Sequence, residues 1–281
     1  MKNYYTLVAG MPDLSPDDAK PACTVEEFKK EYWPQLSVAD RKIVSLFFLK
    51  YDHRNLLARL SGAEEEQPFD SRALYTPEDW DEAIRQVKDD DRQSRRLPSY
   101  FYDFIASWPE LKEVQEHLPE DVLTAGYYRY ALTFKNRFIA DWFSFNRNVN
   151  NILIALTGRK YGFSPAPYIV GDDAVSVALS VSGARDFGLG SELDYIDDVV
   201  RIHEMADPVE KERKLDRLKW DWLDEHTFFC YFTVERLFAF LVRLDIIERW
   251  TLIDKEKGSK MFRGLIDRLK NEVEIPQESM K

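Results

Sequence analysis

The sequence predicts an all-α protein. Three observations lead to this expectation: helix-start signals are frequent, apolar residues recur at steps of three and four, and one short motif recurs at nearly constant spacing. Glycine is scarce, with 11 among 281 residues, which favours long helices over many tight turns. With 44% hydrophobic residues the chain can bury a sizeable core, so one large domain spanning 1–281 is expected.

Capping signals mark where helices begin. Thr24 to Glu27 is a capping box, in which each of the two side chains accepts a hydrogen bond from the other residue's backbone amide. Ser37 to Asp40 is a shorter version of the same device. Further helix starts are predicted at Thr76 and Asp207, each followed by proline at the first helical position, and at Ser191 and Thr233.

Between these signals the apolar spacing is helical. From Tyr127 to Leu156 the apolar steps are all three or four, which predicts one long helix that begins at about Glu120 and has Gly126 as its weak point. Its aromatic stripe, Tyr127 to Phe145, is interpreted as core and not as a ligand site. The segments 41–60 and 234–253 have the same helical spacing.

One stretch, from Val175 to Val181, alternates apolar and polar residues as a strand would. It has no second strand nearby to pair with, and a lone strand is unstable, so a short helix capped at Asp172 is predicted instead. The polar segments 61–75 and 89–99 are expected to be connectors.

The charge and the cysteines restrict the class of protein. A net charge of -11 disfavours nucleic acids and anionic lipids and favours a protein partner. Cys23 and Cys230 do not make a disulfide framework and are read as buried thiols in a reducing compartment. The first ten residues are too short for a signal peptide. The apolar stretch 228–247 is interrupted by charges, which indicates a buried helix and not a membrane span.

One motif occurs twice in clear form. The segments 52–62 and 148–158 share an Asp or Asn, an Asn three residues later, two aliphatics, a Leu, a small hydroxyl residue and a Gly, at an offset of 96 residues. A further 97 residues lead to a degenerate third copy, 245–250. The two polar positions of the copies are Asp52 and Asn55, Asn148 and Asn151, and Asp245 and Glu248, and Phe47, Phe143 and Phe240 precede the copies by five residues.

The motif has a physical interpretation. Residues three apart share one helix face, and the following aliphatics lie on the neighbouring core face. Asn55 and Asn151 are therefore predicted to be structural ties, hydrogen-bonded to a neighbouring helix end or loop, and not contacts to a partner. The closing Gly62 and Gly158 suit helix ends.

The residues from Tyr51 to Leu57 and from Thr233 to Leu241 resemble motifs of the C-type central-stalk family of V-type and A-type ATPases, whose eukaryotic members are called d-type. The opening Tyr5 to Ala9 is similar as well, and Asp245 and Glu248 match two acidic residues of that family's C-terminal signature in type. A bacterial family of uncharacterised proteins associated with V-type ATPases resembles the chain still more closely. The sequence departs from the pattern where Asn148 replaces an acid and Glu248 replaces an Asn.

The resemblance implies a funnel-shaped, pseudo-threefold protein built of approximate units 1–75, 76–165 and 166–281. Such a protein sits on the membrane rotor ring, receives the tip of the central axle and transmits torque between them, without catalytic residues or cofactors. It would be cytoplasmic and peripheral, held at the inner face of the membrane by the ATPase complex. A helical scaffold or assembly factor without a rotor role is the first alternative.

A magnesium-dependent all-α enzyme acting on diphosphates is the second alternative, because Asp194 and Asp198 have the i, i+4 spacing of such sites. The runs 89–91 and 197–198 are better explained as solvated helix termini. His203-Glu204 begins like a zinc-protease motif, but Asp207 stands where the second His is needed. His53, His117 and His226 stand alone in the sequence and are interpreted as helix-surface or core histidines. No catalytic, cofactor or metal residues are therefore predicted. The mixed charges of 210–219 are interpreted as a solvated, paired helix face.

Overall fold

The computed structural model describes the backbone of residues 4–114 and 118–272, and the side chains of residues 4–113 and 118–254. All regular structure in this part of the chain is helical, as predicted. The elements are α1 (Tyr5–Ala9), α2 (Val25–Glu31), η1 (Trp33–Gln35), α3 (Val38–Ser61), α4 (Pro77–Lys88), α5 (Ser99–Val114), α6 (Pro119–Ala131), α7 (Arg137–Tyr161), η2 (Ala166–Tyr168), α8 (Ala174–Val181), α9 (Ile196–Glu204), α10 (Pro208–Thr227) and α11 (Val234–Glu272).

Most of the predicted helix starts are confirmed. Thr24 and Thr76 both form full capping boxes, at α2 and α4. The Ser37 hydroxyl accepts from the amide of Asp40 at the start of α3, and Asp207 caps α10. The helix predicted at Ser191 is wrong: residues 191–195 form turns or have no regular structure, and α9 begins at Ile196.

The predicted long helix over 120–156 is in fact two helices. The chain leaves α6 after Ala131 and enters α7 at Arg137. Asn136 caps α7, because its Oδ1 accepts from the amide of Ile139, and its Nδ2 donates to Glu235 at 2.7 Å. Gly126, the expected weak point, stays inside α6, where it is buried against Tyr100. Helical spacing therefore continues across a break that an Asn cap creates.

The ambiguous stretch around Val175 is the short helix α8, as predicted, although its cap is Asp173 and not Asp172. The two predicted connectors, 61–75 and 89–99, are confirmed apart from Ser61, the last residue of α3, and Ser99, the first residue of α5.

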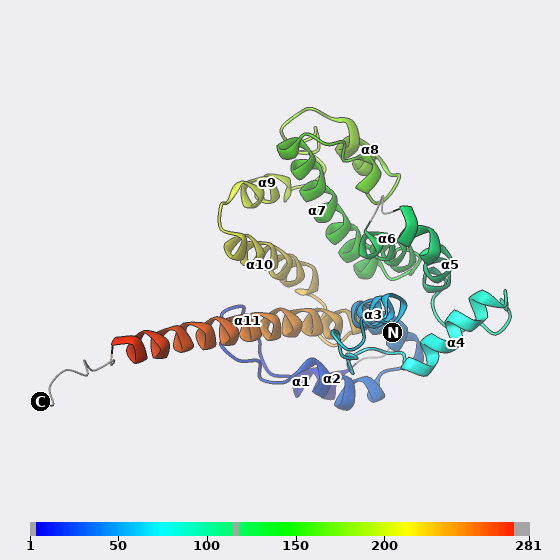
Figure 1. The fold of residues 1–281 in the computed structure, drawn as a ribbon, viewed down its shortest axis with the longest axis horizontal. Coiled ribbons are helices and arrows are strands. Elements are labelled where there is room, and N and C mark those ends of the chain that lie inside the picture. Colours follow the sequence, from blue (N-terminus) through cyan, green and yellow to red (C-terminus); the bar gives the residue numbers. More distant parts are fainter. Residues whose placement is uncertain (1–3, 115–117, 273–281) are drawn as a thin grey trace, which may run out of the picture.

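The larger helices pack in a closed circuit. α3 packs against α6 and α11, α6 against α7, α7 against α9, α9 against α10, and α10 against α11. Figure 1 shows these helices arranged around a common centre, with the C-terminal part of α11 extending away from the others. α5 packs against α6, α4 packs against α5, and α8 packs against α7. Three helices of the circuit, α3, α7 and α11, carry the three copies of the motif.

The apolar stretch 228–247 is only partly a buried helix. Its first residues, Phe228 to Tyr231, form the connection between α10 and α11, and Phe229 is 81% exposed. The remainder, from Val234, is buried in α11. In the part of the chain that the structure describes, no helix is long and apolar enough to cross a membrane.

Cys23 and Cys230 are free but half-buried, so the expectation of buried thiols is too strong. Burial, reinforced by the nearby carboxylates of Glu27 and Glu248, raises the pKa of Cys23 to about 11.

Candidate functional site

The two Asn residues of the clear motif copies make the same contacts. The Nδ2 of Asn55 donates to the carbonyl of Asp70 at 3.1 Å, and its Oδ1 accepts from the amide of Asp70 at 2.9 Å. Asn151 forms the corresponding pair with Val170, at 2.8 and 3.0 Å. Both side chains are buried, at 5% and 0% exposed. Each amide therefore ties the segment that follows its helix back onto that helix.

Asp52 anchors the same loop one turn earlier on α3. Its fully buried carboxylate accepts from the amides of Leu74 and Tyr75 at 3.0–3.2 Å. Burial raises the pKa of Asp52 to about 7, although the two amides and Lys29 favour the charged form. Lys29 holds the loop from the other side, through the carbonyls of Ser71 and Ala73.

Asn148, at the position equivalent to Asp52, has different partners. It is buried, accepts from Arg147 and donates to the Tyr195 hydroxyl at 3.3 Å. The loop after α7 is instead tied by Arg147, which pairs with Asp173. The first polar position of the motif is thus buried in both copies, but only Asp52 binds backbone amides.

The closing glycines also differ. Gly62 ends α3 in the left-handed conformation, as predicted. Gly158 lies inside α7, and the left-handed residue that ends this helix is Gly162. A Cβ on Gly158 would lie 2.9 Å from the carbonyl oxygen of Phe163, so this glycine permits the following chain to approach the helix closely. The prediction that Gly158 is a helix end is therefore wrong.

The third copy of the motif joins α11 to α3 and to the beginning of α2. Asp245 accepts from the Tyr51 hydroxyl at 2.9 Å and pairs with Lys50 at 2.5 Å. Glu248 accepts from the amide of Val25 at 2.6 Å, and Arg72 lies 3.7 Å away. Like Asn55 and Asn151, Glu248 binds a backbone amide, but that amide belongs to the start of α2.

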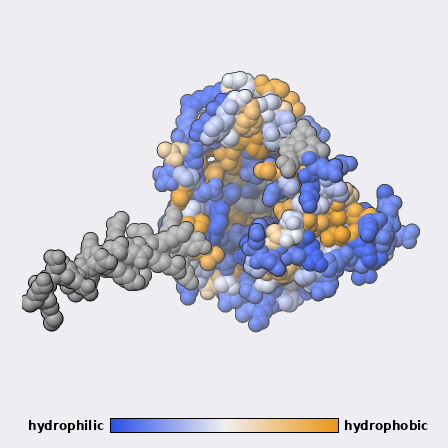
Figure 2. Space-filling view, viewed as in Figure 1, coloured by the Kyte–Doolittle hydropathy of each residue, from blue (hydrophilic) through white to orange (hydrophobic). Residues whose placement is uncertain are grey.

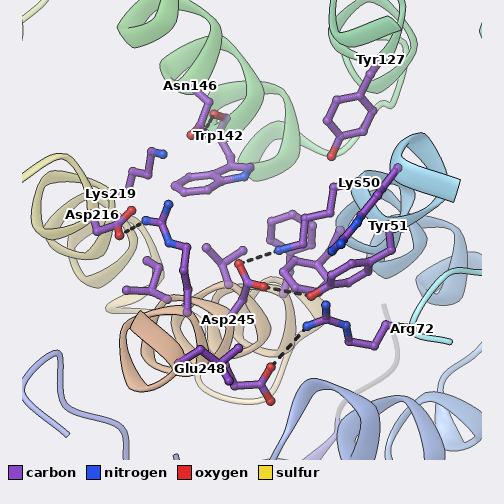
Figure 3. A pocket seen from close by; sticks show the side chains of 17 residues that line it. Lys50, Tyr51, Arg72, Tyr127, Trp142, Asn146, Asp216, Lys219, Asp245 and Glu248 are labelled. Carbon is purple, nitrogen blue, oxygen red and sulfur yellow. Dashed lines mark hydrogen bonds and ion pairs between the residues drawn. The ribbon is translucent and has the colours of Figure 1, made fainter. Parts of the chain in front are cut away.

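A cavity of about 560 Å³ lies between α3, α6, α7, α10 and α11. The hollow near the middle of the space-filling view lies over these elements (Figure 2). Figure 3 shows Trp142 and Asn146 of α7 on one side and Asp245 and Glu248 of α11 on another, with Lys50 and Tyr51 of α3 beside them. The residues of the third motif copy therefore line this space, and Asn55 and Asn151 do not.

The cavity walls combine charge with aromatic surface. Trp142, Tyr127 and Phe238 contribute aromatic surface, and eight of the other lining residues are charged. Burial lowers the pKa of Lys50, while the Asp245 carboxylate opposes the shift. Burial raises the pKa of Glu248, against the amide of Val25 and the Arg72 guanidinium. The lining thus holds close, partly buried ion pairs.

The aromatic stripe belongs to the core or packs against it, although Tyr127, Tyr130, Phe134 and Phe138 are only partly buried. Trp142 and Phe145 are buried, and Phe145 stacks on Trp222 with ring centroids 5.3 Å apart. Tyr127 donates to the carbonyl of Leu46 at 2.6 Å. Trp142 and Tyr127 nevertheless also face the cavity, a second role that the spacing alone did not reveal.

The residues considered for metal chemistry have other surroundings. His203 contacts the Thr157 hydroxyl at 3.3 Å, and Asp198 pairs with Arg201. His53 is held by the Tyr100 hydroxyl at 2.8 Å, and burial lowers its pKa to about 3. Among the side chains that the structure describes, no group of three His, Cys, Asp or Glu residues could hold a metal ion. His117 lies outside the described residues.

The charged face of α10 is only partly as expected. Arg217 pairs with Asp221 on the same helix, at 2.8 Å. Other partners lie on α11: Arg213 pairs with Asp254, and Asp216 pairs with Arg249 and accepts from the indole of Trp250. Asp216 is buried in the seam between α10 and α11, whereas Glu210, Glu212, Arg213, Lys214 and Arg217 are exposed, as expected.

Sequence reasoning missed most of the cavity lining. Lys50, Arg72, Lys219 and Arg249 come from α3, a loop, α10 and α11, and each looks like an ordinary surface residue in its own segment. Only two of these residues could have been connected with the site from the sequence: Lys50 lies next to the first copy of the motif, and Arg249 lies inside the third copy.

The fold and this site define a class: an all-helical protein whose helices pack in a closed circuit around a charged cavity. A comparison with protein families extends this, because residues 1–273 match the family described as "Protein of unknown function (DUF2764)". The chain belongs to that family. No curated protein and no solved structure matches it.

Proposed function

We propose that the protein is a non-catalytic central-stalk subunit of a V/A-type ATPase, which receives the tip of the axle in its cavity and rests on the membrane rotor ring. The observation that carries this proposal is the cavity itself, enclosed by the helices that bear the motif copies and lined by Asp245 and Glu248. A space of about 560 Å³ between packed helices suits the end of a helical partner.

The sequence resemblance supports the same proposal. The residues that carry it, Tyr51 to Leu57 and Thr233 to Leu241, lie on α3 and on the connection into α11, the two helices that Asp245 joins. On this proposal the protein is cytoplasmic and peripheral, and reaches the membrane only through its partners.

An exposed aromatic patch supplies a second partner surface. Phe228, Phe229 and Tyr231 are 61–81% exposed, and α1 adds Tyr5, whose ring centroid lies 4.4 Å from that of Phe232. Clustered exposed aromatics commonly mark protein contacts. We assign this patch to the contact with the rotor ring.

Co-purification tests the proposal. The tagged protein, expressed with the axle and ring subunits of a V/A-type ATPase from the same genome, should capture both. Phe229→Ser is expected to weaken capture of the ring and leave capture of the axle intact. A protein that captures neither would be the free scaffold, and magnesium with pyrophosphate raising its melting temperature would favour the enzyme instead.

A further inference from the structure

The cavity carries the opposite charge to the protein as a whole. The chain has a net charge of -11, but cations outnumber carboxylates by five to three in the cavity lining. The cations are Lys50, Arg54, Arg72, Lys219 and Arg249, and the carboxylates are Asp216, Asp245 and Glu248.

Each of the three carboxylates already has partners. Asp245 is held by Lys50 and Tyr51, and Asp216 by Arg249 together with the indole of Trp250. Glu248 accepts from a backbone amide and faces Arg72. The cavity therefore has no carboxylate left to neutralise a further cation.

Two lining cations remain outside these pairs. Among the side chains that the structure describes, neither Arg54 nor Lys219 has a carboxylate within ion-pair distance. Asp70 is paired with Arg72, and its pKa is lowered, against the effect of burial, by Arg72 and also by the charge of Arg54. Arg54 is exposed on α3 and Lys219 is half-buried on α10, so they come from different helices of the circuit. In Figure 3, Lys219 lies near Asn146 and Trp142, at the α7 wall.

From this imbalance we infer that the polypeptide segment entering the cavity is acidic, and that its carboxylates pair with Arg54 and Lys219. The inference rests on the proposed function and specifies its partner. Because the protein has a net charge of -11, an acidic partner is repelled by the molecule as a whole, and the surplus of cations in the cavity favours docking there. The apolar walls of Trp142 and Phe238 then cover the tip between its charges.

A charge-reversal experiment with a matched control tests the inference. The cavity variant carries Arg54→Glu and Lys219→Glu. The control carries Lys42→Glu and Lys214→Glu, which lie on the same two helices, are exposed and do not line the cavity. Both variants change the net charge equally, so a difference between them measures local pairing. The immobilised proteins capture the axle subunits over a range of salt concentrations.

The cavity variant should bind the axle at least about tenfold more weakly than wild type at low salt, with the control within about twofold. Reversing the acidic residues at the axle tip should restore binding to the cavity variant. Arg54→Gln with Lys219→Gln, which only neutralises the cations, should give a smaller loss. Matching melting temperatures of wild type and variants establish that each is folded.

Three results would overturn the inference. If the cavity variant and the control lost equal affinity for the axle, Arg54 and Lys219 would not pair with carboxylates of the partner. The proposed function would then still stand. Failure of the wild-type protein to capture the axle would remove both. If inorganic phosphate stabilised the wild type but not the cavity variant, and axle capture were unaffected, the cations would serve a small anion instead.

Discussion

Asn55 and Asn151, 96 residues apart, each bind both the amide and the carbonyl of one backbone residue in the segment that follows their helix. A side-chain amide can do this because it carries both a donor and an acceptor. The loops differ in length, since Asp70 lies 15 residues after its Asn and Val170 lies 19 residues after. The two Asn side chains therefore make the same pair of hydrogen bonds, although the segments that they hold lie at different distances along the chain.

Replacing either Asn should destabilise the fold. Asn55→Ala and Asn151→Ala each leave a buried amide and carbonyl without their partner, which costs about 1–3 kcal/mol. Asn→Asp at either site should cost more, because a carboxylate cannot donate to the carbonyl. Urea denaturation of each variant measures the change. The adjacent Asn150 is the control, since it is exposed and bonds only to the Tyr128 hydroxyl. Unchanged midpoints at Asn55 and Asn151 would contradict their role as ties.

Asp52 should make stability depend on pH in an unusual direction. Its pKa in the folded protein is about 7, above the ordinary value of 3.8, so between these values the folded state holds a proton that the unfolded state has lost. Stability from this residue is therefore present at low pH and falls as pH rises from about 4 to about 7. Asp52→Asn keeps an oxygen for the amides of Leu74 and Tyr75 and removes the ionisation.

The stability of Asp52→Asn relative to wild type should therefore increase from pH 4.5 to pH 7.5. Urea midpoints of both proteins, measured across this pH interval, test this prediction. The difference between the two midpoints removes the contribution of all other titrating groups, which the two proteins share. A constant difference across the interval would mean that Asp52 has the same pKa folded and unfolded.

The helical class and most helix starts were predictable because capping and periodicity are local. Thr24, Thr76 and Asp207 satisfy backbone amides within one turn, so sequence alone identifies them. The break at Asn136 was not found, because the apolar spacing runs straight across it. Asn136 also bonds to Glu235, 99 residues away, a contact that no local pattern contains.

The ties within the motif were likewise predictable, since a polar residue beside a core face needs a partner. The cavity was not, because it forms where five separate helices meet. Arg72 lies in a polar connector, and only the folded loop brings it to Glu248. The division into three units remains a prediction, supported by the shared contacts of Asn55 and Asn151.

The seam between α3 and α11 should show energetic coupling between Lys50 and Asp245. Lys50→Met and Asp245→Asn in a double-mutant cycle should give a coupling energy of about 0.5–3 kcal/mol, because the pair is partly buried. The same cycle on the exposed pair Arg217–Asp221 should give about 0.3–0.5 kcal/mol. Equal coupling in the two cycles would indicate that the seam relies on apolar packing alone.

Chelation should leave the protein unchanged. His203 and Asp198 have protein partners in the structure, and neither is part of a ligand cluster among the described side chains. The melting temperature with EDTA is therefore expected to equal that without it. A decrease on chelation, reversed by zinc or magnesium, would establish a metal site.

Gly158→Ala tests how closely the chain approaches α7. Within a helix this substitution ordinarily stabilises, by about 1 kcal/mol. Here the new Cβ would lie 2.9 Å from the backbone carbonyl of Phe163, which cannot rotate away as a side chain could. The sign should therefore reverse, with a loss of about 1–3 kcal/mol from overpacking. Gly183→Ala, at a position outside the helices, is the control for an added methyl group that meets no neighbour, because no atom lies within 4 Å of its added Cβ. Thermal and urea unfolding of both variants measure the difference. A Gly158→Ala protein as stable as wild type would mean that the segment after α7 moves away at little cost, and that the glycine is not required for the close approach.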